Sequence, residues 1–407
     1  MGSENITPFQ LREIILNARK PLILKKFNCQ WSCFKDGLSK WCAKYDSYSK
    51  EKPQFEKMPV KNELNEPQWE RKRTMERMSA MEFLNLYSNN EDCSTWSGLN
   101  YKRRNELPVE STTGVDFGCF GFPNVNDECT FWLSSKGANT PCHYDTYGCN
   151  VVVQIFGRKS WLLFPPGTSG LTTTRIPYEE SSVYCLENFY APTAMDVIKL
   201  SKLSGQCYHY VLEPNDVLIV PRHWWHFVEA LETSLSVNAW IPLSCDVDNQ
   251  IEECIVKYFM DKMIANKDST TRHYLMNPNQ LNSNTSDDEL FNILEYLLEQ
   301  KNNVYEHAAK KTSSVHQYHY IDENNLISLI KSFGNICEVS LMADDDWEMY
   351  LKRNCTRCNS EKINEGAVAT TLRNSEDILI NSICSPYIVQ TIKEEFCRRY
   401  IKNKTKE

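Results

Sequence analysis

The run GANTPCHYDTYGCNVVVQIFGRKSWLLFPP, residues 137–166, contains two strand-sized segments rich in Val, Ile, Leu, Phe and Trp. Similar short apolar segments, separated by Gly, Pro, Asn and Asp, extend from about Asp116 to Pro242 and are typical of a β-sandwich or barrel. Gly157–Arg158 separates CNVVVQIF from SWLLFP and predicts a tight type II′ hairpin, because glycine accepts a positive φ at the first central position. Downstream, EPND at 213–216 predicts a turn that leads into the strand VLIVP.

Length and composition place the chain among ordinary globular proteins. It has 407 residues, of which 41% are hydrophobic and 24% charged, enough for one large domain and a smaller one. The formal net charge of −8 argues against a general polyphosphate binder. The opening MGSENITPFQ has no apolar run after a basic start, so we expect no secretory signal, a cytoplasmic location with the nucleus as the alternative, and reduced thiols among the 17 cysteines. The longest apolar stretches are strand-sized, so no membrane span is expected.

The pattern predicts three regions. Residues 1–114 should form a strand and helices that support the barrel, including one helix face across the methionine-rich stretch from Met75 to Leu84. Residues 115–245 should form the β core, with a long irregular insertion at 166–210, and residues 246–407 should be α-helical. In this last region, a capping box begins a helix at Ser286–Glu289, and Ser385–Pro386 begins the final helix. The predicted fold class is therefore mainly β with added helices.

His143 and Asp145 lie two residues apart in a predicted strand. Side chains with this spacing share a face, so both point into the barrel or both point out. A carboxylate inside would be costly without a partner, and a divalent cation would remove that cost. Two histidines and one carboxylate, with other positions open, suit non-haem Fe(II). The spacing alone is a weak signal, and two ordinary polar residues on the barrel are the alternative.

The predicted third ligand is His226, in the stretch PRHWWHFVE at 221–229. A turn at Asp216 and a strand precede it, which is the layout of a barrel strand that delivers a histidine. His223 lies three residues earlier, and this odd spacing turns it to the opposite face, so we interpret it as a rim or surface residue. His209 lies in the predicted insertion and is interpreted as a surface histidine.

Four motifs, in order, resemble the JmjC domain: Thr-Pro-x-His-x-Asp, Gly-x-Lys, Trp-Trp-His and Val-Asn-x-Trp. The resemblance is most specific across about residues 115–245. It implies a double-stranded β-helix, the cupin-like fold of Fe(II)/2-oxoglutarate oxygenases. RIPYEESSV at 175–183 is similar to JmjC proteins that associate with small heat-shock proteins. The chain also resembles the factor-inhibiting asparaginyl hydroxylases and the tRNA wybutosine hydroxylase.

The resemblance implies that iron is bound by His143, Asp145 and His226, and that Thr140 and Lys159 hold the distal carboxylate of 2-oxoglutarate. An inward ammonium at Lys159 would need an anionic partner, which a dicarboxylate supplies. The alternatives are a solvated lysine beside the hairpin and a turn threonine before proline.

Asn150 and Asn238 match family positions that line the cosubstrate pocket. One departure concerns the first of them: relative to the asparaginyl hydroxylases, the chain has an extra residue between Asp145 and Asn150, which leaves the placement of Asn150 open.

Elsewhere, Cys355 and Cys358 have the spacing of half a zinc site, but a lone Cys-x-x-Cys is weak evidence for zinc.

The resemblance predicts an Fe(II)- and 2-oxoglutarate-dependent hydroxylase acting on a protein, with demethylation as an alternative outcome. A small heat-shock protein is an expected partner. One rival is a non-catalytic adaptor with a vestigial barrel that binds such a protein through the C-terminal helices. Another is an RNA hydroxylase, which the acidic net charge disfavours. The apolar faces of the C-terminal helices also predict a homodimer.

Overall fold

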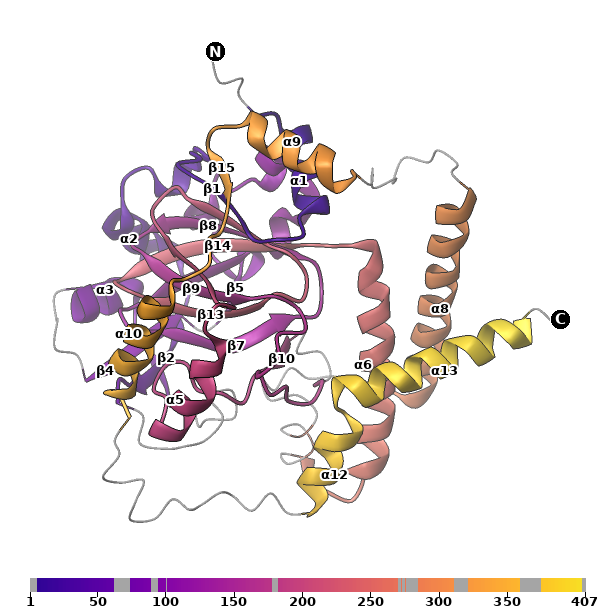
Figure 1. Cartoon of the computed structure of the whole chain (residues 1–407). Helices are drawn as coiled ribbons and strands as arrows, with labels where there is room; N and C mark the ends of the chain where they lie inside the picture. Colours follow the sequence, from indigo (N-terminus) through magenta and orange to yellow (C-terminus); the bar gives the residue numbers. More distant parts are fainter. Residues whose placement is uncertain are drawn as a thin grey trace.

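The computed structural model describes residues 6–61, 74–88, 94–99, 101–177, 182–269, 272, 275, 285–310, 321–358 and 375–404. Two antiparallel sheets face each other in the predicted double-stranded β-helix (Figure 1). The smaller sheet has the order β10 (Ser182–Tyr184), β7 (Asn139–Asp145), β13 (Trp225–Ala230), β9 (Lys159–Phe164) and β11 (Tyr208–Leu212). The larger sheet has the order β15 (Ile336–Glu338), β1 (Leu22–Leu24), β12 (Val217–Val220), β8 (Cys149–Phe156), β14 (Ser234–Ile241), β6 (Thr130–Ser134), β4 (Thr95–Leu99), β2 (Gln54–Pro59) and β3 (Thr74–Arg77), with β5 (Lys102–Arg103) paired to β6.

The predicted hairpin at Gly157–Arg158 is wrong, because β8 and β9 belong to different sheets. Strand β8 pairs with β12 and β14, whereas β9 pairs with β11 and β13. Both strands therefore have their two edges occupied by other partners. Gly157, with φ +64°, turns the chain from one sheet to the other, and a Cβ there would lie 2.3 Å from the carbonyl oxygen of Thr233. The turn predicted at 213–216 is confirmed, and it likewise connects the two sheets.

Alternation along the strands creates a barrel interior and two outer faces. Val152 and Leu218 of the larger sheet pack inside the barrel against Leu163 and Leu212 of the smaller one. The opposite face of the larger sheet packs against helices from the N-terminal region and a C-terminal helix: α1 (Pro8–Asn17), α2 (Leu38–Tyr48), α3 (Ala80–Ser88) and α9 (Glu323–Ser332). The opposite face of the smaller sheet packs against α5 (Ala194–Leu200), α6 (Val247–Met263) and α10 (Asp344–Cys355).

The methionine-rich stretch is only partly a helix. Met75 lies on β3, which pairs with β2, and its side chain is 37% exposed. Helix α3 begins at Ala80, after Ser79 and Glu82 cap each other's backbone N–H groups. The predicted single helix face is therefore wrong at Met75, where strand pairing overrides the helical period, and at Met78, which precedes the helix.

The predicted insertion at 166–210 is more regular than expected. It contains β10, α5 and the start of β11. Strand β10 pairs with β7 and brings Tyr184 opposite His143. Part of the stretch 175–183, residues 178–181, lies outside the described residues.

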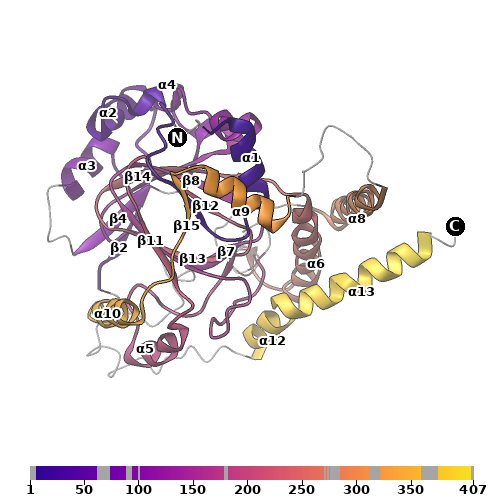
Figure 2. The same cartoon turned by 45° about the horizontal axis from the view of Figure 1, so that its top comes forward.

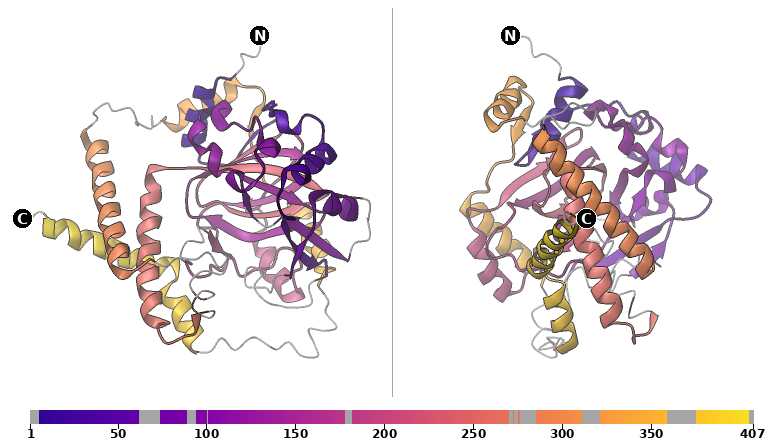
Figure 3. Two further views of the ribbon diagram at one scale, coloured as in Figure 1. Left: turned by 180° about the vertical axis from the view of Figure 1, so that it is seen from behind. Right: turned by 90° about the vertical axis from the view of Figure 1, so that its right-hand side faces the viewer.

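Four C-terminal helices gather on one side of the barrel, apart from α9 and α10 (Figures 1 and 3). They are α6, α8 (Asp287–Lys310), α12 (Ser375–Ile383) and α13 (Pro386–Lys404); a short N-terminal helix, α4 (Val109–Thr112), lies apart from them. The capping box at Ser286–Glu289 and the final helix starting at Pro386 are both confirmed. Figure 2 shows α9 beside α1. Across the described residues, no helix has both the length and the apolar composition to cross a bilayer.

Both flanking regions also contribute to the larger sheet. Strand β1, from the N-terminal region, lies between β12 and β15, and β15 comes from the C-terminal region. The boundaries near residues 115 and 245 stay a prediction.

Candidate metal centre

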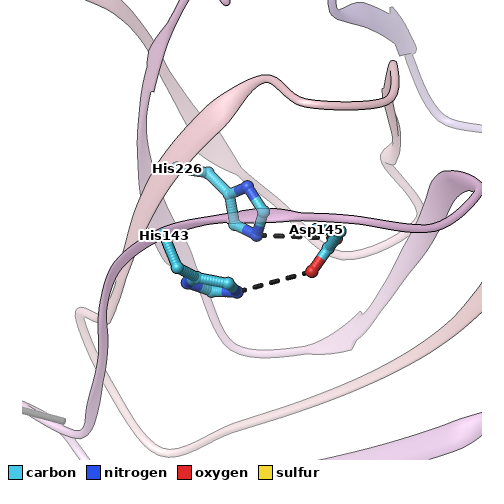
Figure 4. A group of neighbouring side chains, drawn as sticks. All are labelled: His143, Asp145 and His226. Atoms are coloured by element: carbon cyan, nitrogen blue, oxygen red, sulfur yellow. Dashed lines mark ion pairs between the residues drawn. The ribbon is translucent and has the colours of Figure 1, made fainter. Parts of the chain in front are cut away.

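Three side chains converge inside the barrel: His143, Asp145 and His226 (Figure 4). The Nε2 atom of His143 lies 3.5 Å from Asp145 Oδ1, and the Nε2 atom of His226 lies 3.8 Å from Asp145 Oδ2. One ligand atom from each residue lies within 4.8 Å of the other two. All three residues are buried.

Strand register produces this convergence. His143 and Asp145 share a face of β7 because they are two residues apart. His226 lies directly opposite His143 on the paired strand β13, and the two imidazole centroids are 4.2 Å apart. A local sequence pattern and one long-range strand pairing therefore bring the three ligands together.

Both imidazoles are held with Nε2 toward the shared centre. His143 Nδ1 lies 2.8 Å from the carbonyl oxygen of Pro141, and His226 Nδ1 lies 2.9 Å from that of Trp224. A carbonyl oxygen only accepts hydrogen bonds, so each Nδ1 carries the proton and each Nε2 offers its lone pair. Such outer hydrogen bonds orient histidines that bind metals.

The charges also suit a divalent cation. Burial alone would raise the pKa of Asp145, but the neighbouring imidazoles of His226 and His143 lower it to about 2. Burial, followed by the effect of His143, lowers the pKa of His226 to about 4. At neutral pH the site therefore presents a carboxylate and a neutral imidazole at these two positions, the forms that bind metals.

A directed hydrogen-bond chain holds Asp145. Trp132 donates to Asn238 Oδ1 at 2.7 Å, Asn238 donates to Asn150 Oδ1 at 2.8 Å, and Asn150 donates to Asp145 Oδ2 at 3.2 Å. The orientations of the Asn238 and Asn150 amides follow from the two ends of this hydrogen-bond chain, because the indole of Trp132 only donates and the carboxylate of Asp145 only accepts. Trp240 donates a second bond to Asp145 Oδ2 at 2.9 Å. The extra residue before Asn150 has therefore not removed it from the site.

Lys159 points into the barrel, which excludes the solvated alternative. Its ammonium donates to Ser236 Oγ at 2.8 Å and approaches the carbonyl oxygen of Trp132 at 3.5 Å. Burial lowers its pKa to about 7. Among the described residues, no carboxylate lies within ion-pair distance of this ammonium.

Thr140 reaches the same face as His143 because β7 contains a bulge. His143 pairs with His226 and Thr140 pairs with Val228, so residues 141–142 lie together opposite Phe227. The extra residue shifts the alternation, and Thr140 turns toward the barrel interior with Val228.

The other candidate residues lie elsewhere. His209 lies on β11 and bonds to Ser160 Oγ at 3.0 Å, on the outer face of the smaller sheet. His223 precedes β13 and packs against Tyr144, also outside the barrel. Within the described part of the chain, the triad is the one group of three or more ligands found, so Cys355 and Cys358 have no such cluster.

Sequence reasoning missed several residues of the site. Ser236 and Trp240 share the inner face of β14 with Asn238, in the alternating sequence Ser234–Ile241. Polar side chains at every second position of a buried strand are a signal that could have found them. Tyr184 packs against His143 with centroids 5.3 Å apart, and only the pairing of β10 reveals it.

These residues fit a divalent metal and a dicarboxylate. Two imidazole nitrogens and a carboxylate oxygen are the ligand set of non-haem iron sites, and they would hold such a metal here. Deeper in the barrel, Lys159 supplies a buried amine with no carboxylate partner in the described part of the chain, and Thr140 lies on the same inner surface.

Comparisons with known proteins agree with this geometry. A family model described as a cupin-like domain matches residues 8–246. HSPB1-associated protein 1 from Bos taurus is 36% identical over 294 residues, 68% of this chain and 59% of the relative, and the Homo sapiens protein is 35% identical over 299 residues, 68% and 60%. Lysine-specific demethylase 8 from Xenopus tropicalis is 26% identical over 240 residues, 56% of this chain and 49% of the relative.

The chain thus spans about three fifths of the length of the HSPB1-associated relatives. The matched family model covers every strand of the two sheets except β15, including the strands that carry the triad and Lys159. On this evidence, the chain belongs to the family of cupin-like, JmjC-type domains.

Proposed function

We propose that this protein is an iron(II)- and 2-oxoglutarate-dependent oxygenase. The observation that carries the proposal is the presence, in one barrel, of a facial set of ligands and a buried ammonium without a carboxylate partner among the described residues. A dicarboxylate that reached from the metal to Lys159 would satisfy both.

When bound, the metal and the cosubstrate supply oxygen activation: 2-oxoglutarate and O₂ become succinate and CO₂, and one oxygen atom enters a C–H bond of the substrate. The residues of the chain position these groups. His143, Asp145 and His226 would hold the metal. Lys159 and Thr140 hold the distal carboxylate, and the hydrogen bonds from Asn150 and Trp240 keep Asp145 in place.

We propose a protein as the substrate. Two kinds of relative support this choice, because one is named for association with HSPB1 and another as a lysine-specific demethylase. A small heat-shock protein is the proposed partner or substrate. Hydroxylation at a carbon beside a methylated nitrogen would release formaldehyde, so demethylation is an outcome of the same chemistry. The net charge of −8 counts against an RNA substrate.

An adaptor role is the second candidate, and one observation favours it. The C-terminal helices expose large apolar side chains, including Phe291 at 46%, Tyr296 at 59% and Tyr387 at 77%. Exposed apolar side chains mark a protein-binding surface where they form one contiguous patch. The proposed homodimer would use the same helices, and light scattering of the purified chain would distinguish a dimer from a monomer.

The first experiment measures cosubstrate binding and turnover. We expect the purified chain, loaded with Fe(II), to bind 2-oxoglutarate and convert it slowly to succinate, followed by NMR. His143→Ala and Asp145→Ala should abolish turnover without loss of the fold. His209→Ala is the matched control, because this histidine lies on the outer face of the same sheet. If the loaded wild type binds no 2-oxoglutarate, only the adaptor role is left.

The second experiment identifies the substrate. The inactive Asp145→Ala variant would be used to capture bound molecules, and mass spectrometry would be applied to separate protein and RNA fractions. Enrichment of one protein that gains 16 mass units only with the active enzyme, a mass shift set by insertion of one oxygen atom, would support the protein substrate. A modified RNA in its place would contradict it.

A further inference from the structure

Trp161 faces the barrel interior beside the metal ligands. It lies on β9 two residues after Lys159, so the two side chains share a face. The indole is 5% exposed, and it stacks on the imidazole of His226 with centroids 5.7 Å apart and planes 29° apart. Trp161 is not one of the three metal ligands, and it is not one of the residues proposed above to hold the cosubstrate.

The Nε1–H group of Trp161 is buried and has no acceptor among the residues that the structure describes. An indole nitrogen only donates, and buried donors in folded proteins almost always have a partner. Three other indoles of the barrel follow this rule: Trp132 donates to Asn238, Trp240 to Asp145 and Trp224 to the carbonyl oxygen of Arg19. The exception at Trp161 indicates an acceptor that is not part of the chain.

Strand register places Trp161 between the metal ligands and Lys159. Across β7, β13 and β9, one row contains His143, His226 and Leu163. The next row, deeper in the barrel, contains Thr140, Val228 and Trp161. The row below it contains Ala230 and, opposite it, Lys159. A molecule held by the metal at one end and by Lys159 at the other must cross the row of Thr140 and Trp161.

We propose that Trp161 donates a hydrogen bond from Nε1 to the distal carboxylate of 2-oxoglutarate, as a third ligand beside Lys159 and Thr140. This inference rests on the proposed function. A carboxylate is the acceptor that matches the site, because the ammonium of Lys159, one row deeper in the barrel, attracts an anion. Stacking on His226 fixes the plane of the indole, so its N–H points in one direction before the cosubstrate arrives.

The test compares two ligands with one variant. Titration calorimetry would be carried out on the full chain loaded with Mn(II), using 2-oxoglutarate and 2-oxobutyrate, which lacks the distal carboxylate. Trp161→Phe keeps an aromatic ring over His226 and removes the N–H. We expect the affinity for 2-oxoglutarate to fall about 10- to 100-fold, as for loss of one hydrogen bond to a charged group, and the affinity for 2-oxobutyrate to stay the same.

Trp41→Phe is the matched control. Trp41 is equally buried, lies outside the barrel on α2, and donates to the carbonyl oxygen of Ser111 at 2.8 Å. This variant should melt at a lower temperature because it leaves that carbonyl without its donor, yet it should bind 2-oxoglutarate as the wild type does.

Three results would overturn the inference. If Trp161→Phe binds 2-oxoglutarate as tightly as the wild type, the N–H has another role. If the variant loses affinity for both ligands equally, packing against His226 is responsible. If the wild type itself binds no 2-oxoglutarate, the proposed function fails together with the inference.

Discussion

The ammonium of Lys159 lies 2.8 Å from the hydroxyl of Ser236, and these two residues come from opposite sheets of the barrel. A hydroxyl satisfies one of the three N–H donors but offers no charge. Below about pH 7 the barrel thus encloses a cation that has no carboxylate partner among the described residues. The buried charge of Lys159 therefore lowers the stability of the free protein and raises its affinity for an anion.

Lys159→Met should weaken binding of 2-oxoglutarate. Loss of one partner from a buried ion pair costs about 3–5 kcal/mol, so the dissociation constant should rise by about two to four powers of ten. Calorimetry on the Mn(II)-loaded chain would measure it. Arg158→Ala is the control, because this neighbouring cation is 47% exposed and pairs with Glu232 at the surface. An unchanged affinity in Lys159→Met would mean that Lys159 does not contact the cosubstrate.

The free protein should become more stable as the pH rises above 7. The pKa of Lys159 falls from 10.5 to about 7 on burial, so between these values the unfolded state binds a proton that the folded state does not. The free energy of unfolding then rises with pH, at most about 1.4 kcal/mol per pH unit, and this gain stops near pH 10.5.

Urea denaturation of the wild type and Lys159→Met at pH 6.5 and 9.5 would test the sign. The variant should be the more stable protein at pH 6.5, and its advantage should shrink at pH 9.5. An advantage that grows with pH would contradict the buried, unpaired ammonium.

Asn150→Ala should lower the affinity for the metal by about 10- to 100-fold, as for loss of an outer hydrogen bond to a ligand. Asn238→Ala should have a smaller effect, because Asn238 contacts Asp145 only through Asn150. Competition titrations with a metal-binding dye would rank the variants. Asn354→Ala, a buried asparagine that bonds to the carbonyl oxygen of Phe189 at 2.9 Å, should change stability but leave metal affinity unaltered.

Lys393→Met should destabilise the docking of α13. Lys393 Nζ lies 2.6 Å from Glu252 on α6, and both side chains are buried. Removing the Lys393 ammonium takes away the ion-pair partner of the buried Glu252 carboxylate. The free energy of unfolding should therefore fall by about 3–5 kcal/mol in chemical denaturation. Adding Glu252→Gln should recover part of the loss. Lys52→Met, at the exposed pair with Glu82, should cost less than about 1 kcal/mol.

Much of the site was predictable because its signals are local. The shared face of His143 and Asp145 follows from strand alternation alone, and Lys159 follows from the resemblance.

Other features needed long-range pairing. Alternation by itself would turn Thr140 outward, and only the pairing with β13 reveals the bulge that turns it inward. The hairpin predicted at Gly157 failed for a similar reason, since a turn signal does not say which sheet receives the next strand.

The amino-acid sequence by itself determined the strands, the caps of the helices and the face that carries the first two ligands, because these depend on residues a few positions apart. The tertiary structure decided that His226 meets them, that Asn238 reaches Asp145 through Asn150, and that Lys159 has no carboxylate among the described residues. These outcomes depend on which strands become neighbours. The strands become neighbours because their pairing buries three apolar clusters at the same time. The residues of each cluster come from many parts of the chain, so no single stretch of sequence predicts the pairing.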